Sequence, residues 1–202
     1  MRGEDKRIIG IYSRHASAFD RQRSRALFEQ AWLNRFLAAM PPERAVLDLG
    51  CGSGEPLAGY LIAAGCDVTG IDTSVDLLAL CMARFPQHAW LQGDMRALAL
   101  QRRFQGVLAW DSFFHLTPDD QRGMFRIFRD HLGAGGVLMF TSGSAADVRI
   151  GEFQGEPLYH ASLDGDEYRE LLARHGFEVL SHRAEDPECG GHTVWLAKLT
   201  CQ

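Results

Sequence analysis

The stretch Val46–Pro56, VLDLGCGSGEP, decides the fold of this chain of 202 residues. A short apolar strand is predicted at residues 45–49, and a glycine-rich turn then leads into a helix whose first turn suits Pro56. Glycines let the backbone bend tightly and leave its amide groups open to a ligand, since no Cβ blocks them. In an open α/β sheet this turn lies at the carboxyl end of the strands, where ligands bind. The stretch therefore predicts a ligand site between the first strand and the first helix of such a sheet.

The charge of this turn separates two classes of ligand. Gly50 and Gly52 match the first two glycines of the dinucleotide fingerprint, but Glu55 stands where the third glycine would be. A carboxylate at the start of the helix would repel a pyrophosphate, which normally binds there. S-adenosylmethionine has no phosphate and carries a cationic sulfonium and an ammonium group. The pattern therefore favours S-adenosylmethionine over NAD.

Acidic residues also follow the next two predicted strands. Asp72 ends the strand predicted at 67–71, about twenty residues after the glycines, where an acidic residue accepts hydrogen bonds from ribose hydroxyls. Asp72 does not separate NAD from S-adenosylmethionine, and it could instead cap the next helix, as could Thr73. Asp94 and Met95 follow a third predicted strand, where the carboxylate can receive the adenine amino group and the thioether can pack on the ring.

The rest of the chain alternates between strand and helix patterns, which is typical of a mainly parallel sheet covered on both faces. Residues 142–163 lack periodicity and are predicted to form a long loop. Two strands near the end have no helix between them and should pair antiparallel. Helices are predicted over 13–40, from Pro56, at 75–85, at 118–131 and from Asp164 to 175, and strands at 45–49, 67–71, 89–92, 106–110, 137–141, 177–182 and 193–199.

Taken in order, the motifs resemble those of the class I S-adenosylmethionine-dependent methyltransferases, of the small-molecule, ubiquinone-biosynthesis type. They are VLDLGCGSG, VTGIDTS, LQGDM, GVLAWDSFFHL and LGAGGVLMF, all between residues 45 and 141. The resemblance implies an α/β, Rossmann-like, doubly wound seven-stranded sheet, mostly parallel with an antiparallel last strand, plus N-terminal helices. We expect one methyltransferase domain over 1–202: an N-terminal helical cap (1–42), a cofactor-binding core (43–141), a lid-like loop (142–163), and a helix with a terminal hairpin (164–202).

The resemblance also implies roles for single residues. It places the methionine part of the cofactor on Asp48 and the two glycines, the ribose on Asp72, the adenine on Asp94 and Met95, and the methyl group near Trp110. A tetrapeptide Asn/Asp-Pro-Pro-aromatic, frequent in enzymes that methylate exocyclic nitrogens, is replaced here by DSFF at 111–114, which argues against nucleic-acid bases. The expected cofactor contacts are Asp48, Gly50, Cys51, Gly52, Asp72, Thr73, Asp94, Met95 and Trp110.

The acceptor of the methyl group is expected to be a small molecule. A net charge of −5 and the lack of a dense Lys/Arg run argue against nucleic acid. Methyl transfer by direct displacement mainly needs alignment, and a neutral histidine or tyrosine would help to remove a proton from the acceptor. The candidates for this role are His115, Tyr159, His160 and His192, each of which has a structural alternative.

Three other functions stay open: a non-catalytic module that binds S-adenosylmethionine, a methyltransferase that acts on a macromolecule, and an NAD-type oxidoreductase. No apolar run reaches the roughly 18 residues of a membrane span and the N-terminus lacks a secretory core, so we expect a cytoplasmic monomer or homodimer without a membrane partner. The five cysteines match no ligand spacing, and a site built from His160, Cys189 and His192 matches none either. We therefore expect no metal.

Overall fold

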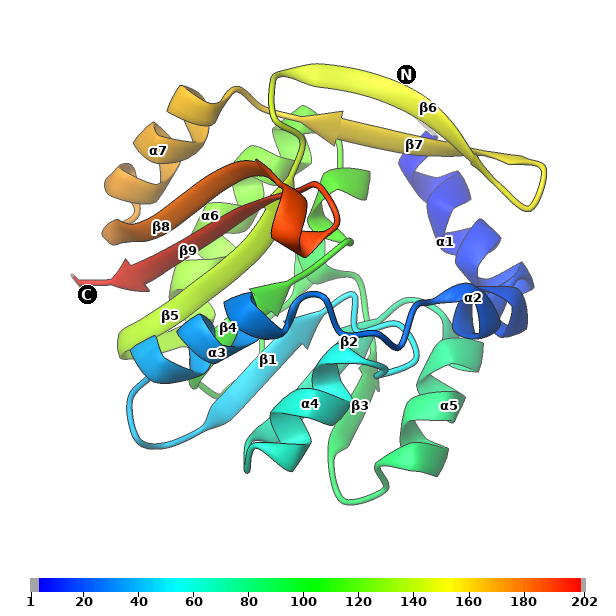
Figure 1. Ribbon diagram of the computed structural model, residues 1–202, viewed down its shortest axis with the longest axis horizontal. Coiled ribbons are helices and arrows are strands. Elements are labelled where there is room, and N and C mark those ends of the chain that lie inside the picture. The colour runs from blue at the N-terminus through cyan, green and yellow to red at the C-terminus, as the bar shows by residue number, and fades with distance from the viewer. Residues whose placement is uncertain (1–3, 201–202) are drawn as a thin grey trace.

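The computed structural model describes residues 4–200, and a seven-stranded sheet runs through its centre (Figure 1). The strand order is β3-β2-β1-β4-β5-β9-β8, and the first five of these strands are parallel. β9 pairs antiparallel with both β5 and β8. This confirms the predicted Rossmann-like sheet and its antiparallel last strand. The strands are β1 (Ala45–Leu49), β2 (Asp67–Asp72), β3 (Ala89–Gln92), β4 (Phe104–Ala109), β5 (Leu132–Ser142), β8 (Phe177–Asp186) and β9 (His192–Leu199).

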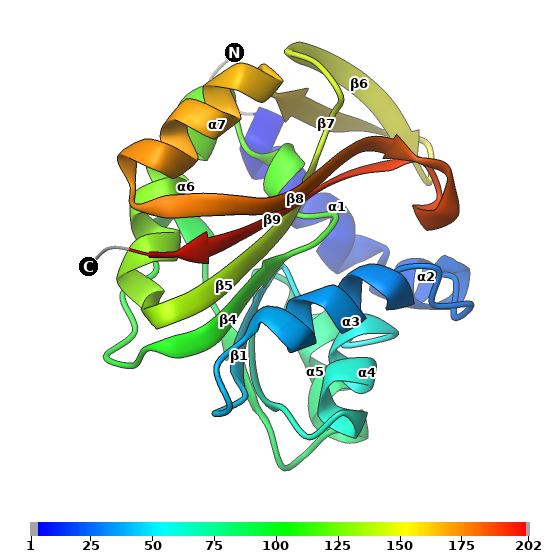
Figure 2. The same ribbon diagram turned by 60° about the vertical axis from the view of Figure 1, so that its left-hand side comes forward.

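Helices cover both faces of the sheet, as the alternating pattern predicts (Figure 2). α3 (Gln30–Ala39) and α4 (Leu57–Ala63) pack on one face, where Phe36 and Leu61 are fully buried. α6 (Pro118–His131) and α7 (Gly165–Arg174) pack on the other, in the same core cluster as Phe113. α5 (Val75–Arg84) follows β2. The two apolar cores hold the carboxyl ends of the strands in fixed positions.

The N-terminal region forms three helices instead of the single helical region predicted over 13–40. α1 (Glu4–Arg14) and α2 (Ala16–Gln22) precede an irregular stretch that leads into α3. Leu27 in this stretch has a φ of +48°, which a helix does not allow. Apolar residues at helical spacing on both sides of the break hide it in the sequence. Arg21 therefore lies in α2, whereas Arg25 lies beyond its end.

The segment 142–163, predicted as a loop, contains a hairpin of β6 (Asp147–Phe153) and β7 (Glu156–Ser162). The prediction was wrong because β6 is exposed along almost its whole length, so it has no alternation of buried and exposed side chains. Backbone hydrogen bonds hold it instead. Gln154 and Gly155 connect the strands, and both have a positive φ, as a tight two-residue hairpin turn requires. The hairpin lies beside α1, apart from the large sheet (Figure 1).

The hairpin and α1 share a small apolar cluster of their own, in which Ile8 and Ile11 meet Leu158 and Tyr159.

Short 3₁₀ helices complete the fold at η1 (Met95–Ala97), η2 (Phe113–His115) and η3 (Pro187–Cys189). No helix in the described part of the chain is both long and apolar enough to cross a membrane. Cys201, one of the five cysteines, lies outside the described residues.

Candidate active site

The glycine-rich turn is built so that only glycine fits at its closest points. Gly50 and Gly52 have φ values of +75° and +55°. A Cβ on Gly50 would lie 2.3 Å from the Cβ of Ser112, which no packing tolerates. Asp72 fixes the turn from the next strand, since its Oδ2 accepts a hydrogen bond from Gly52 N at 2.9 Å and its Oδ1 accepts one from Ser74 N at 2.9 Å. The turn and the end of β2 therefore form one rigid unit.

Two adjoining hollows open at the carboxyl end of the sheet. The central cavity lies between the ends of the strands and α1, which contributes Ile8 and Tyr12 to its lining. The glycine-turn pocket adjoins it, and the two share Phe19 and Asp111 among their lining residues. The structure brings all the expected cofactor contacts together: Gly50, Gly52, Asp72, Thr73, Asp94 and Met95 line the central cavity, and Asp48, Cys51 and Trp110 line the glycine-turn pocket.

The charge of these hollows is negative on the side of the turn. Asp48, Asp72 and Asp111 all contribute to their lining. Burial, and then the charge of Asp72, raises the pKa of Asp48 to about 7, and burial raises the pKa of Asp72. Trp110 is buried, and its Nε1 has no hydrogen-bond partner among residues 8–200. Buried carboxylates and an unused donor fit a ligand with a cationic centre and an acceptor oxygen, and they do not fit a pyrophosphate.

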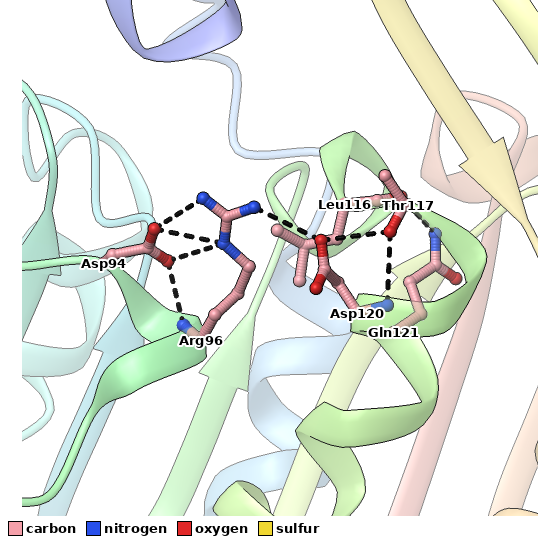
Figure 3. A network of polar contacts seen from close by, with 6 residues as sticks. All are labelled: Asp94, Arg96, Leu116, Thr117, Asp120 and Gln121. Atoms are coloured by element: carbon pink, nitrogen blue, oxygen red, sulfur yellow. Dashed lines mark hydrogen bonds and ion pairs between the residues drawn. The ribbon is translucent and has the colours of Figure 1, made fainter. Parts of the chain in front are cut away.

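The predicted adenine contact Asp94 lines the central cavity. Its carboxylate accepts hydrogen bonds from Arg96, whose guanidinium also reaches Asp120 at the start of α6 (Figure 3). This arrangement lowers the pKa of Asp94, chiefly through the hydrogen bond from Arg96. Asp94 is therefore ionised and held in place, with Met95 beside it in the cavity lining. A carboxylate so placed can accept from an amino group on a ring.

Among the four predicted proton acceptors, His115 lines the central cavity. Its Nδ1 lies 2.9 Å from the carbonyl oxygen of Tyr159, so Nδ1 carries the proton and donates it there. Nε2 is then an acceptor, and the hydroxyl of Tyr12 donates to it at 2.9 Å. Burial lowers the pKa of His115 to about 4, and burial raises that of Tyr12. At neutral pH the pair is therefore an uncharged imidazole and an uncharged phenol.

The other three candidates lie elsewhere. Tyr159 meets His115 through its carbonyl oxygen, and its own ring packs in the apolar cluster under α1. The ring of His160 lies 4.8 Å from that of His115 and lines a different cavity. His192 lies with its Nε2 3.0 Å from Asp111 Oδ1. Tyr12, the partner of His115, was not predicted as one, because 103 residues separate the two in the sequence.

No three His, Cys, Asp or Glu side chains within the described part of the chain are grouped to hold a metal ion. His160 lines the hairpin side of the fold, whereas the Nδ1 of His192 bonds to the carbonyl oxygen of Cys189.

The basic residues near the N-terminus are engaged within the chain: Arg14 pairs with Glu156, Arg23 with Glu29, and Arg25 with Asp20.

Comparison with known proteins places this site in a family. Residues 46–136, which contain the glycine-rich turn, β2 and the end of β4, match the sequence model of the methyltransferase domain family. Those residues are a class I methyltransferase domain. The resemblance to the class I methyltransferases that the motifs indicated is thereby confirmed. The family also agrees with the preference for S-adenosylmethionine over NAD that the charge of Glu55 predicted.

Relatives of this methyltransferase domain act on different acceptors. The chain is 33% identical over 101 residues to a dTDP-3-amino-3,4,6-trideoxy-alpha-D-glucopyranose N,N-dimethyltransferase of Streptomyces venezuelae, covering 49% of this chain and 42% of that protein. It is 30% identical over 158 residues to a trans-aconitate 2-methyltransferase of Rhodopseudomonas palustris, covering 74% of this chain and 59% of that one. The chain thus spans about half the length of the curated relatives it matches.

A solved structure with the same fold is the Burkholderia thailandensis 1,6-didemethyltoxoflavin-N1-methyltransferase, which holds 1,6-didemethyltoxoflavin and S-adenosylhomocysteine. The TM-score is 0.73 at 19% identity, and the match covers 98% of this chain and 87% of that one. At this identity the likeness supports the methyltransferase fold and says nothing about the acceptor.

Proposed function

We propose that the chain transfers a methyl group from S-adenosylmethionine to a small-molecule acceptor by direct displacement, leaving S-adenosylhomocysteine. The observation that carries the proposal is the set of buried carboxylates around a glycine turn. Asp48 and Asp111 line the pocket with carboxyl oxygens that can accept from an ammonium group and lie near a sulfonium, and the unpartnered Nε1 of Trp110 supplies a donor for an acceptor oxygen. A phosphate-bearing cofactor would meet repulsion at the same place.

Each end of the cofactor has a matching group. The methionine part fits the glycine-turn pocket with Asp48, Cys51 and Trp110. The ribose hydroxyls fit Asp72, beside Thr73, and the adenine fits Asp94 and Met95. S-adenosylmethionine supplies an electrophilic methyl group on a sulfonium, so the protein has to align the acceptor and exclude water. α1 does this by closing the cavity with Tyr12 and Ile8.

Tyr12 and His115 orient the acceptor. The phenol proton points at the Nε2 of His115, which leaves the lone pairs of the Tyr12 oxygen to accept a hydrogen bond from a hydroxyl or amine. An imidazole whose pKa is about 4 is a weak base at neutral pH, so the pair holds the acceptor and does not ionise it before attack. This role differs from that of the general base expected for His115.

The acceptor itself is proposed to bind in a second cavity of about 400 Å³ below the hairpin, here called the hairpin cavity. Its lining comes from the carboxyl end of β5, from Phe114 in η2 and from both hairpin strands. His160 lines it, and its ring packs at a tilt 4.8 Å from that of His115, which lines the central cavity, so these two rings connect the two spaces. The hairpin would then be the lid that residues 142–163 were predicted to form.

The hairpin cavity is suited to an uncharged part of the acceptor. Its two charged residues, Asp147 and Arg149, pair with each other. The hydroxyl of Ser162 accepts from Gly143 N at 2.8 Å and that of Ser144 donates to Glu185 at 2.9 Å. Burial lowers the pKa of His160, which keeps its ring neutral. Phe114 adds an aromatic wall.

Two assays test the proposed function. Isothermal titration of the purified chain with S-adenosylmethionine and S-adenosylhomocysteine should show binding at micromolar strength. A panel of small hydroxyl, amine and carboxylate compounds, incubated with methyl-labelled cofactor, should reveal an acceptor. No binding of either compound would contradict the proposal, and binding without transfer to any small molecule would favour a non-catalytic module or a macromolecular acceptor.

Filling the hairpin cavity should impair acceptor binding alone. Ala145 lines this cavity, and Ala146 next to it does not, although both are exposed. Ala145→Trp should raise the KM for the acceptor by about tenfold, the loss of roughly 1.4 kcal/mol of binding, with cofactor affinity unchanged. Ala146→Trp is the matched control and should leave KM at the wild-type value. Equal KM values for the two variants would place the acceptor elsewhere.

Location in the cytoplasm, the absence of nucleic-acid and membrane partners, and a monomeric or homodimeric state are also proposed. The net charge of −5 argues against a nucleic-acid partner, and the spacing of the five cysteines, which suits no disulfide framework, fits the cytoplasm. Size-exclusion chromatography with light scattering measures the oligomeric state directly.

A further inference from the structure

Four charged side chains of alternating sign form a network beside the glycine-turn pocket. Arg23 donates to Glu29 Oε1 at 2.7 Å and lies 3.6 Å from Asp111 Oδ2. Asp111 Oδ1 lies 3.0 Å from the Nε2 of His192. Arg23 caps the end of α2 and Glu29 precedes α3, while Asp111 follows β4 and His192 opens β9. This network of charges thus joins the N-terminal cap, the central sheet and the terminal hairpin.

The two ring nitrogens of His192 both face oxygen acceptors. Nδ1 lies 2.7 Å from the carbonyl oxygen of Cys189, and Nε2 faces the Asp111 carboxylate. The contact to Asp111 Oδ1 is an ion pair, because that oxygen has no hydrogen-bond partner among the described residues. A neutral ring protonated at Nδ1 would turn the lone pair of Nε2 toward the carboxylate and repel it, so both contacts are favourable only when His192 is an imidazolium. The rings of Phe28 and Trp110 cover it, with centroids at 5.6 and 5.5 Å, and aromatic faces favour a cation. His192 therefore already carries the proton that a general base would have to take up.

The titratable groups around His192 come from three elements. Asp111 follows β4, fully buried Glu29 lies at the start of α3, and Cys189 precedes the ring in the terminal hairpin. Burial lowers the pKa of His192, but Asp111, the Cys189 carbonyl and Glu29 together raise it above its ordinary value. Burial raises the pKa of the Cys189 thiol to about 12, so it stays neutral. Arg23, the neighbouring cation, is already matched by Glu29.

Asp111 is held in an unusual conformation. Its φ is +49°, which costs free energy for any residue other than glycine. Its backbone N–H donates to Thr141 Oγ1 at 2.9 Å, and its carboxylate is bracketed by His192 and Arg23. Asp111 lines both the central cavity and the glycine-turn pocket. Its partners thus place a carboxylate at the junction of the two.

We propose that His192 is a positioning residue, whose imidazolium holds the Asp111 carboxylate at this junction and so keeps the N-terminal cap closed over the methionine end of the cofactor. The inference rests on the proposed function, since it takes the cofactor to occupy these hollows. Loss of the proton from His192 leaves Asp111 paired with Arg23 alone and loosens the tie between the cap and the terminal hairpin.

The first test needs no ligand. In the free protein, NMR titration of the histidine rings should show His192 losing its proton at a pH above the ordinary value of about 6.5. In Asp111→Asn the titration should move down by about one pH unit. His182, which stacks on Trp195 at 3.6 Å, is the internal control and should titrate identically in both proteins. A His192 titration below pH 6.5, or one that Asp111→Asn does not move, would refute the proposal.

The second test measures S-adenosylhomocysteine affinity at two pH values. Wild type should bind about fivefold more tightly than His192→Gln at pH 6, which is the contribution of one partly buried ion pair. At pH 9 the difference between the two proteins should be smaller, because wild-type His192 loses its proton as the pH rises. Asp48, whose pKa is about 7, also changes the affinity with pH, but it does so in both proteins and leaves their ratio unchanged.

His182→Gln is the matched control and should bind like wild type at both pH values. A ratio between wild type and His192→Gln that stays the same at pH 6 and pH 9 would show that His192 is merely structural, and would overturn the proposal. Absence of binding by every protein would instead contradict the proposed function, and the NMR titration would still decide the role of His192.

Discussion

Replacing Asp72 by alanine is expected to weaken the binding of S-adenosylhomocysteine by about 100-fold. A carboxylate that accepts from the ribose hydroxyls makes hydrogen bonds to a charged group, worth about 1.5 to 3 kcal/mol each, and about 2.7 kcal/mol corresponds to 100-fold in affinity. The same carboxylate accepts from Gly52 N and Ser74 N, so its removal also releases the turn that shapes the methionine end. Isothermal titration measures the change.

The control for this prediction is Asp76→Ala. Asp76 is an exposed residue in the first turn of α5, so the variant changes the net charge equally without touching the cavity. It should bind within about twofold of wild type, since exposed charges interact weakly. Asp72→Asn keeps one acceptor oxygen and should fall between the two. Wild-type affinity in an Asp72→Ala protein that melts cooperatively would remove Asp72 from the site.

The structure brings the expected cofactor contacts together because their positions depend on local sequence. Gly50 and Gly52 need a positive φ, and Asp72 lies at a fixed distance along the chain from them, so one βαβ unit contains the whole signal. The buried strands are also local signals, because each is a short apolar run between turns. The cofactor end of the central cavity could therefore be placed from residues 45–95 alone.

The acceptor side could not be predicted in this way, because its contacts join distant segments. Tyr12 meets His115 only when α1 closes over the sheet, and His192 meets Asp111 only when the terminal hairpin folds back. The protonation state of a histidine cannot be predicted from the sequence until these partners are known. His115 is neutral and His192 is cationic for reasons of burial and charge that no motif records. The hairpin was missed because an exposed strand leaves no apolar pattern.

The acid stability of the protein should depend strongly on His115. Its pKa is about 4 in the folded state against about 6.5 when unfolded, so below pH 6.5 the unfolded chain takes up a proton that the folded chain refuses. The contribution of this residue to the free energy of unfolding is therefore fully present above pH 6.5, and it is lost as the pH falls toward 4. A difference of roughly 2.5 pH units corresponds to about 3 kcal/mol. Urea unfolding at pH 7, 5.5 and 4.5 follows this loss.

Between pH 7 and pH 4.5 the free energy of unfolding should fall less in His115→Asn than in wild type, because asparagine does not titrate. The difference between the two proteins should be most of the about 3 kcal/mol assigned to His115. The raised pKa of Asp48 acts in the opposite direction, since a protonated carboxyl is tolerated in the core, but it contributes equally to both proteins. Tyr12→Phe should give an intermediate slope, because it removes the hydroxyl that donates to Nε2 and favours the neutral ring. Parallel slopes in all three proteins would mean that His115 takes up its proton at the same pH in the folded and the unfolded chain, so that neither burial nor Tyr12 keeps its ring neutral.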